Sequence, residues 1–145
     1  MLVMLLGLVI AVSTSASGAD AHECAHLDGC GCALRIEERS CPSGLAHFSH
    51  ALHDGAPLRF RISGVEIMAD SEVEWTGSFS HGEGDSWSER YRAAIGGVEL
   101  RYQPAPSSCT KESEPCEFFD VRAEILIRPV DHPSYVLQAT GVCGC

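Results

Sequence analysis

The chain has 145 residues, and its 20 acidic side chains outnumber the 10 basic ones, which gives a formal net charge of −10. Because the basic residues are scattered, this charge repels nucleic acid and anionic lipid, and we expect neither as a partner. The length suits one domain that buries a core of its own. The chain lacks Asn and contains a single Lys, a composition typical of a GC-rich bacterial genome.

The N-terminal run from Met1 to Val12 is apolar and too short to span a bilayer. Small residues follow it, and Ser17 and Ala19 suit a cleavage site ahead of Asp20. We therefore predict that residues 1–19 are a signal peptide and that the mature protein, without a transmembrane segment, is secreted or periplasmic. No Lys or Arg precedes the apolar run, which departs from the usual pattern of an export signal.

Alternation of apolar and polar residues predicts strands along the second half of the chain. It begins over 58–62, and a change of parity after Gly64 is interpreted as a β-bulge. A second strand is expected over 72–79. The strongest alternation covers 119–128, and a last strand is expected from Tyr135 after a turn.

The clearest local signal is a predicted hairpin whose turn is Gly96-Gly97, since two adjacent glycines can both adopt positive φ. Counting outward from this turn places Tyr91 opposite Tyr102. The inward face of the hairpin would then carry apolar and aromatic side chains on both strands.

These signals predict an all-β fold, an antiparallel β-sandwich or partly open barrel, stapled by disulfides. We expect residues 20–57 to be a Cys/His-rich N-terminal segment that joins the antiparallel β domain, residues 58–145, in one globular unit. Within the first segment, 30–36 suits a strand and 45–52 a short helix. Residues 103–117, with three prolines and no apolar period, are expected to be a loop.

All the cysteines lie downstream of the apolar run, and export into an oxidising compartment makes each a disulfide candidate. The candidates are Cys24, Cys30, Cys32, Cys41, Cys109, Cys116, Cys143 and Cys145. Two Cys-Gly-Cys triplets begin at Cys30 and Cys143, and alternation places both cysteines of each triplet on an apolar face. We predict that these sulfurs point inward and that at least one bridge joins the triplets. The alternative is a zinc site made by four reduced cysteines.

We also predict a bridge between Cys109 and Cys116 within the Pro-rich loop, where a short closed loop is favourable.

Three histidines, His47, His50 and His53, recur every third residue. On a short helix His47 and His50 would lie on neighbouring turns of one face, a spacing that can chelate a metal. Zinc is favoured over copper(I), because Met68 is the one methionine left after processing. The alternative is a solvated polar segment that binds no cofactor.

One resemblance covers two short stretches. The Cys-x-Cys at Cys30, followed by the sequence from Glu72 to Gly77, is similar to netrin-like modules, OB-type barrels that include metalloproteinase inhibitors. In those inhibitors the cysteine is the mature N-terminus, whereas Cys30 lies beyond the predicted cleavage site. The resemblance therefore implies no inhibitory mechanism and assigns no family.

The chain contains no Gly-x-Ser-x-Gly elbow, phosphate-binding glycine loop or His-Glu-x-x-His helix, so an enzyme is not the first hypothesis. We predict an exported, disulfide-stabilised β domain with a binding or structural role, whose partner is an unidentified extracellular ligand or protein. A zinc-binding exported protein is the alternative, and a hydrolytic or redox enzyme is the third hypothesis.

Overall fold

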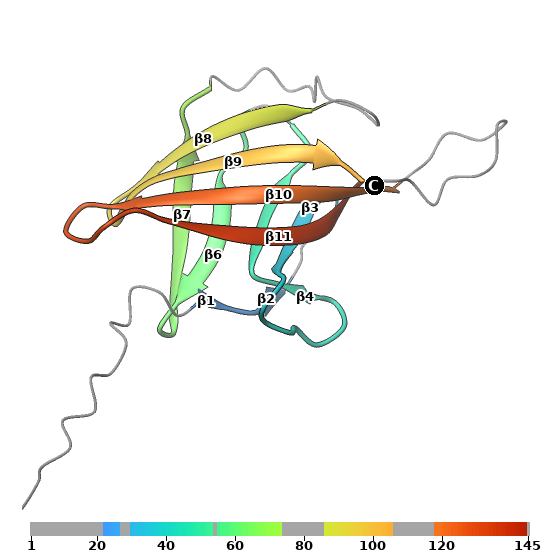
Figure 1. Ribbon diagram of the computed structural model, residues 1–145, viewed down its shortest axis with the longest axis horizontal. Helices are drawn as coiled ribbons and strands as arrows, with labels where there is room; N and C mark the ends of the chain where they lie inside the picture. The colour runs from blue at the N-terminus through green and yellow to red at the C-terminus, as the bar shows by residue number, and fades with distance from the viewer. Residues whose placement is uncertain (1–21, 27–29, 54, 74–85, 106–117, 145) are drawn as a thin grey trace, which may run out of the picture.

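The computed structural model describes residues 22–26, 30–53, 55–73, 86–105 and 118–144. Within these ranges the regular elements are β-strands (Figure 1). The predicted signal peptide, the proposed Cys109–Cys116 bridge and most of the strand expected over 72–79 lie outside the described residues.

Eight strands form a closed antiparallel barrel: β3 (Gly31–Ile36), β5 (Phe48–Ala51), β6 (Leu58–Ile62), β7 (Val65–Ser71), β8 (Trp87–Ala93), β9 (Gly96–Pro104), β10 (Phe118–Pro129) and β11 (Tyr135–Gly144). Each barrel strand pairs with the next along the chain, and β11 pairs with β3. Outside this ring, β1 (His22–Glu23) pairs with β6, and β2 (Ala25–His26) pairs with β4 (Leu45–Ala46). The predicted all-β antiparallel fold is confirmed, and the barrel is closed.

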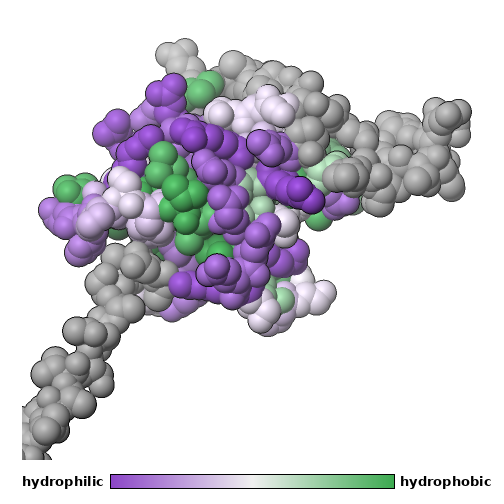
Figure 2. Space-filling view, in the orientation of Figure 1, coloured by the Kyte–Doolittle hydropathy of each residue, from purple (hydrophilic) through white to green (hydrophobic). Residues whose placement is uncertain are grey.

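The alternation seen in the sequence divides each long strand between the core and the outer surface. On β10 every second side chain from Val121 to Ile127 is buried. The outer face carries charge, and Arg101 bridges Glu99 at 2.8 Å and Glu124 at 3.1 Å. Figure 2 shows a mostly hydrophilic surface with a hydrophobic patch over β10 and β11. The barrel is therefore an apolar core wrapped by a polar shell.

The up-and-down strand order gathers alternate connections at the same end of the barrel. The turns of the β6–β7, β8–β9 and β10–β11 hairpins lie at one end, on the left and lower side of Figure 1. The β3–β5 connection lies there too, because Glu37 at its start donates to the carbonyl of Gln138 near the beginning of β11. We call this the hairpin end. The C-terminus lies at the opposite end.

The seam between the first and last barrel strands carries a buried disulfide. Cys32 and Cys143 are paired in register on β3 and β11, with Cα atoms 4.0 Å apart. Each triplet contributes one cysteine, so the predicted link between the triplets is confirmed. Cys30 is also disulfide-bonded but exposed, so the expectation that every triplet sulfur points inward is wrong. Its position before the start of β3 removes it from the alternation of the strand.

The hairpin predicted around the double glycine is present, but its turn is Ala94-Ile95. Tyr91 therefore pairs with Val98, while Tyr102 pairs with Trp87, and both tyrosines still face inward. Gly96, with a φ of 134°, lies against the carbonyl oxygen of Arg128 on β10, where a Cβ atom would overlap it. The close contact with β10, and not the geometry of the turn, therefore explains why residue 96 is a glycine.

Two further expectations are wrong for local reasons. The parity change after Ile62 is a hairpin turn rather than a bulge, since Ser63 and Gly64 have φ of 48° and 80° and Ile62 pairs with Val65. The segment expected as a short helix over 45–52 forms β4 and β5 instead. There, β5 completes its backbone hydrogen bonds by pairing with β3 and β6.

We expect Gly96→Ala to be much more destabilising than Gly97→Ala. A methyl group at Gly96 meets the β10 backbone, which should lower the free energy of unfolding by about 1–3 kcal/mol. At Gly97 it would meet only the Tyr91 carbonyl oxygen at 3.9 Å, so the change should stay within about 0.5 kcal/mol. Urea unfolding of both variants measures the difference, and equal losses would contradict the assigned register.

Removal of the seam disulfide by the double substitution Cys32→Ala, Cys143→Ala should lower the free energy of unfolding by up to about 4.7 kcal/mol. The bridge spans 111 residues of sequence, so the unfolded chain gains much conformational freedom without it. Denaturant unfolding followed by Trp fluorescence measures the loss. An unchanged midpoint would show that the closed seam does not need its covalent link.

Candidate functional site

A cavity of about 700 Å³ opens at the hairpin end. Its lining is mainly apolar and comes from both sides of the opening, including Ile62, Ile67, Ile95, Ile127, Val130 and Tyr135. Three exposed polar side chains, Glu66, Asp131 and His132, complete it. The cavity therefore combines an apolar body with a polar margin.

The cavity lies where the barrel wall is least tightly paired. β7 and β8 pair only at Asp70–Arg92 and Ser71–Tyr91, whereas β10 and β11 pair along most of their length. The first half of β7, from Val65, diverges from the end of β8 and lines the cavity opposite the β8–β9 turn. This divergence places the opening of the cavity between the start of β7 and the β8–β9 turn.

A histidine from the first strand is placed beside the cavity. His22 on β1 is 4% exposed, and its Nε2 lies 3.0 Å from the hydroxyl of Tyr135, which lines the cavity. The His22 ring packs against Phe48 and Phe60, with ring centroids 5.1 and 6.0 Å away. β1 thus supplies a buried polar group next to the apolar lining.

A second polar group lies inside the barrel. His50 Nδ1 donates to the carbonyl oxygen of Ala51 at 2.9 Å, while His50 Nε2 lies 2.7 Å from the Tyr102 hydroxyl and 3.4 Å from the Glu89 carboxylate. The hydroxyl of Tyr91 donates to the same carboxylate. Burial, reinforced by the charge of Glu89, raises the pKa values of both tyrosines, so their hydroxyls remain protonated donors.

These hydrogen bonds give the interior group a structural character. The Tyr102 hydroxyl donates to His50 Nε2, so Nε2 is the unprotonated ring nitrogen. Nδ1 therefore carries the proton that it donates to the Ala51 carbonyl oxygen. Trp87 stacks on Tyr102 with centroids 4.4 Å apart. Both ring nitrogens of His50 and the hydroxyls of Tyr91 and Tyr102 have hydrogen-bond partners within the barrel, and such a network specifies one core arrangement.

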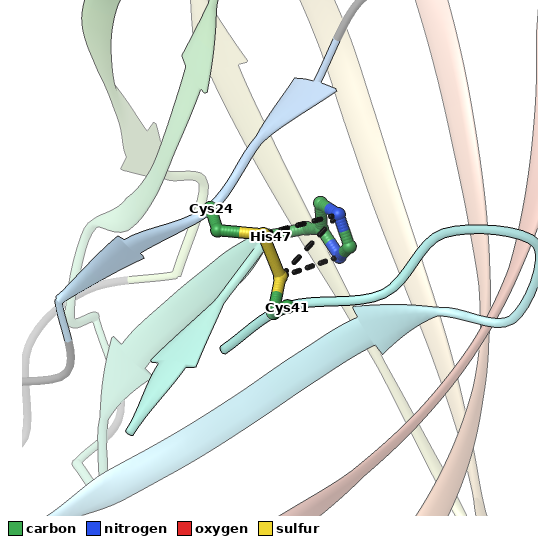
Figure 3. A group of neighbouring side chains, drawn as sticks. All are labelled: Cys24, Cys41 and His47. Atoms are coloured by element: carbon green, nitrogen blue, oxygen red, sulfur yellow. Dashed lines mark hydrogen bonds between the residues drawn. A yellow bond between two sulfur atoms is a disulfide. The ribbon is translucent and has the colours of Figure 1, made fainter. Parts of the chain in front are cut away.

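A third group lies at the hairpin end, where Cys24 meets Cys41 and His47 beside the paired strands β2 and β4 (Figure 3). Cys24 and Cys41 form a disulfide with Cα atoms 5.7 Å apart. The His47 Nε2 atom lies 3.6 Å from the Cys24 sulfur and 3.5 Å from the Cys41 sulfur. Among the described residues, these three form the one group of possible metal ligands.

The bonds of His47 fix its protonation. The backbone N–H of Ile36 donates to His47 Nδ1 at 3.0 Å, so the ring proton resides on Nε2. Burial, with the charges of Arg39 and Arg35, lowers the pKa of His47, which keeps the ring neutral. In this state both sulfurs belong to a disulfide and neither ring nitrogen offers a free lone pair, so no cofactor is established.

The structure separates the three histidines expected to share a metal. His47 contacts the Cys24–Cys41 disulfide, His50 belongs to the interior network, and His53 belongs to neither group. The helix that would have aligned them is a pair of strands. A zinc site made by these three residues is therefore not assembled here.

Sequence reasoning missed three features of these groups. Glu89 shares strand parity with Trp87 and Tyr91, so alternation already placed it on the inward face. The cavity could not be found until the Ser63-Gly64 turn was recognised, because that turn brings the start of β7 to the hairpin end. The partnership of His47 with Cys24 and Cys41 left no signal in residue spacing.

The chain matches no protein-family model, no curated protein and no solved structure. The similarity to netrin-like modules thus gains no support. Within the described ranges there is no helix with the length and apolar character needed to cross a membrane. Functional inference therefore depends on the geometry of the groups described above.

Acid should destabilise the protein partly through His47. Its pKa in the folded state is lowered, so the unfolded chain binds the proton first as pH falls. The contribution of the neutral ring is present above about pH 6.5, the ordinary histidine value, and is lost as pH falls through it toward the folded value. Urea midpoints measured from about pH 8 to pH 5 should decline more in the wild type than in His47→Asn.

Proposed function

We propose that this chain is an exported binding protein that holds a small, mainly apolar molecule in the cavity at the hairpin end. The main support for this proposal is the cavity itself. Its volume of about 700 Å³ lies within the range of roughly 300–1,000 Å³ typical of small-molecule sites. Mouths of β-barrels are common positions for such sites, and an eight-stranded barrel has room for one small ligand.

The polar margin indicates which end group the ligand carries. Asp131 is exposed in the lining of the cavity. Glu66, which also lines the cavity, forms an ion pair with the Arg59 guanidinium at an N–O distance of 3.0 Å. The whole chain carries a net charge of −10, which repels anions. A neutral or cationic end group therefore suits this margin better than a carboxylate.

Export is part of the proposal and is supported by the cysteine chemistry. The two described disulfides and the bonded state of Cys30 suit an oxidising compartment, where such bonds persist. The apolar N-terminal run provides the expected signal. Secretion of the full chain with loss of residues 1–19, measured by intact mass, would test this part.

Binding can be measured with the neutral fluorophore N-phenyl-1-naphthylamine and its displacement by decylamine, decanol and decanoate. We expect fluorescence enhancement by the wild type, with the amine and the alcohol displacing the probe better than the acid. Val65→Glu places a charge in the lining at a side chain that is 62% exposed, so it should weaken binding at least about tenfold without unfolding the barrel.

Val136→Glu is the matched control. Val136 is also exposed, at 49%, but lies on the outer face of β11 in register with Leu126 and outside the cavity lining. This variant should bind the probe as the wild type does. Binding lost in Val136→Glu and retained in Val65→Glu would move the site to the outer patch and overturn the proposal.

Zinc binding is a second candidate function, favoured by the clustering of Cys24, Cys41 and His47. It needs the disulfide reduced and the hydrogen bond from Ile36 to His47 given up, because a thiolate and an imidazole lone pair are the ligands zinc takes. Native mass spectrometry with added zinc, before and after reduction, tests it. One zinc per chain in the reduced protein alone would support this candidate.

A further inference from the structure

The two described disulfides occupy different environments. Cys32 and Cys143 are 1% and 0% exposed inside the seam of the barrel. Cys24 and Cys41 are both partly exposed and link the segment after β1 to the β3–β5 connection. A thiol in solution can therefore approach the second bridge while the first is enclosed by packed strands.

The partly exposed bridge lies against the His47 ring, and the Cys41 sulfur is 3.5 Å from both ring nitrogens. His47 itself is 2% exposed and lies beneath the bridge, with Nε2 within 3.6 Å of both sulfur atoms (Figure 3). Since Ile36 N–H occupies Nδ1, the Nε2 atom carries the proton. Nε2 is thus the ring nitrogen that can donate to a nearby sulfur that gains negative charge.

Two guanidinium groups are anchored around the same ring. Arg35 donates to the carbonyl oxygen of Leu45 at 2.9 Å, and Arg39 donates to the carbonyl oxygen of His22 at 3.2 Å. Burial lowers the pKa of His47, and the charges of Arg39 and Arg35 lower it further. A positive field next to a cysteine favours its thiolate form, which is the better leaving group in disulfide exchange.

We propose that Cys24–Cys41 is a site of reversible thiol–disulfide exchange, with a dithiol as co-substrate and His47 as the positioning residue. A thiolate of the co-substrate attacks one sulfur of the bridge, the S–S bond breaks, and the other sulfur departs as a thiolate that accepts the hydrogen bond from Nε2. The second thiolate of the co-substrate then attacks the mixed disulfide. Two electrons pass to Cys24 and Cys41, their thiolates take up the two protons lost by the co-substrate to become thiols, and the co-substrate becomes a disulfide.

The same geometry favours exchange over metal binding at this group. A zinc ligand must present a ring nitrogen with a free lone pair, whereas Nε2 here is a donor. A developing thiolate, in contrast, needs a donor, and Nε2, which carries the proton, lies within 3.6 Å of both sulfurs. The bond from Ile36 to His47 is therefore the observation that separates the two chemistries.

The test is stepwise reduction of the oxidised full chain with dithiothreitol, followed by alkylation and peptide mass spectrometry. We expect Cys24 and Cys41 to be alkylated at least about tenfold faster than Cys32 and Cys143. Reoxidation with a small disulfide should restore the bridge. Equal rates for both bridges, or faster reduction of the seam, would overturn the proposal.

Two substitutions at His47 separate its role from a packing role. His47→Asn keeps an acceptor near the position of Nδ1 for the Ile36 N–H but removes the donor, so reduction should slow about tenfold, the effect of losing one hydrogen bond to a charged sulfur. His47→Gln places an amide N–H near the position of Nε2 and should recover much of the rate. His53→Asn is the matched control, because His53 lies outside this group.

Each outcome of the variant series is decisive. Slow exchange in His47→Asn with recovery in His47→Gln, while circular dichroism stays that of the wild type, supports the donor role. Unchanged reduction rates in both variants would show that His47 does not assist the exchange and would contradict the proposal. One zinc per chain in the reduced wild type, lost in both variants, would show that Nε2 gives up its proton and that the group is a metal site instead.

Discussion

The barrel depends on the pairing of its first strand with its last. β3 and β11 meet after more than a hundred intervening residues. Closing so long a loop costs more conformational entropy than forming any of the local hairpins. Two features of the seam offset this cost. The Cys32–Cys143 bond removes freedom from the unfolded chain, and Gly141 lets the strands approach, since a Cβ there would overlap the carbonyl oxygen of Ala33.

A strongly fixed seam allows another part of the wall to open. β7 and β8 hold together only near Asp70 and Ser71, yet the ring remains closed because the covalent link lies elsewhere. The divergence exposes an apolar side chain of the inward parity of β7 that a tighter barrel would bury, Val65. Retaining such a surface costs stability, so a ligand that covers it is the simplest physical reason for it to persist.

Strand identity and inward faces were predictable because burial with a period of two is a local property of the sequence. The alternation on β10 and the inward placement of Tyr91 and Tyr102 are examples. The register of the β8–β9 hairpin was not predictable from the sequence. Gly96 is required by its close contact with the backbone of β10, and it lies outside the turn that joins β8 to β9. The grouping of His47 with two cysteines depends on β2–β4 pairing, which is set by the whole fold.

The two described disulfides contribute differently to stability, and this difference permits one of them to open. Cys24–Cys41 closes a separation of 17 residues, worth about 3 kcal/mol in the chain-entropy model, and it lies outside the barrel seam. Its reduction therefore leaves the β3–β11 closure intact. Cys24 directly follows β1, and β1 holds His22 against Tyr135 in the cavity lining. The bridge and the cavity lining are thus joined by one short strand at the hairpin end.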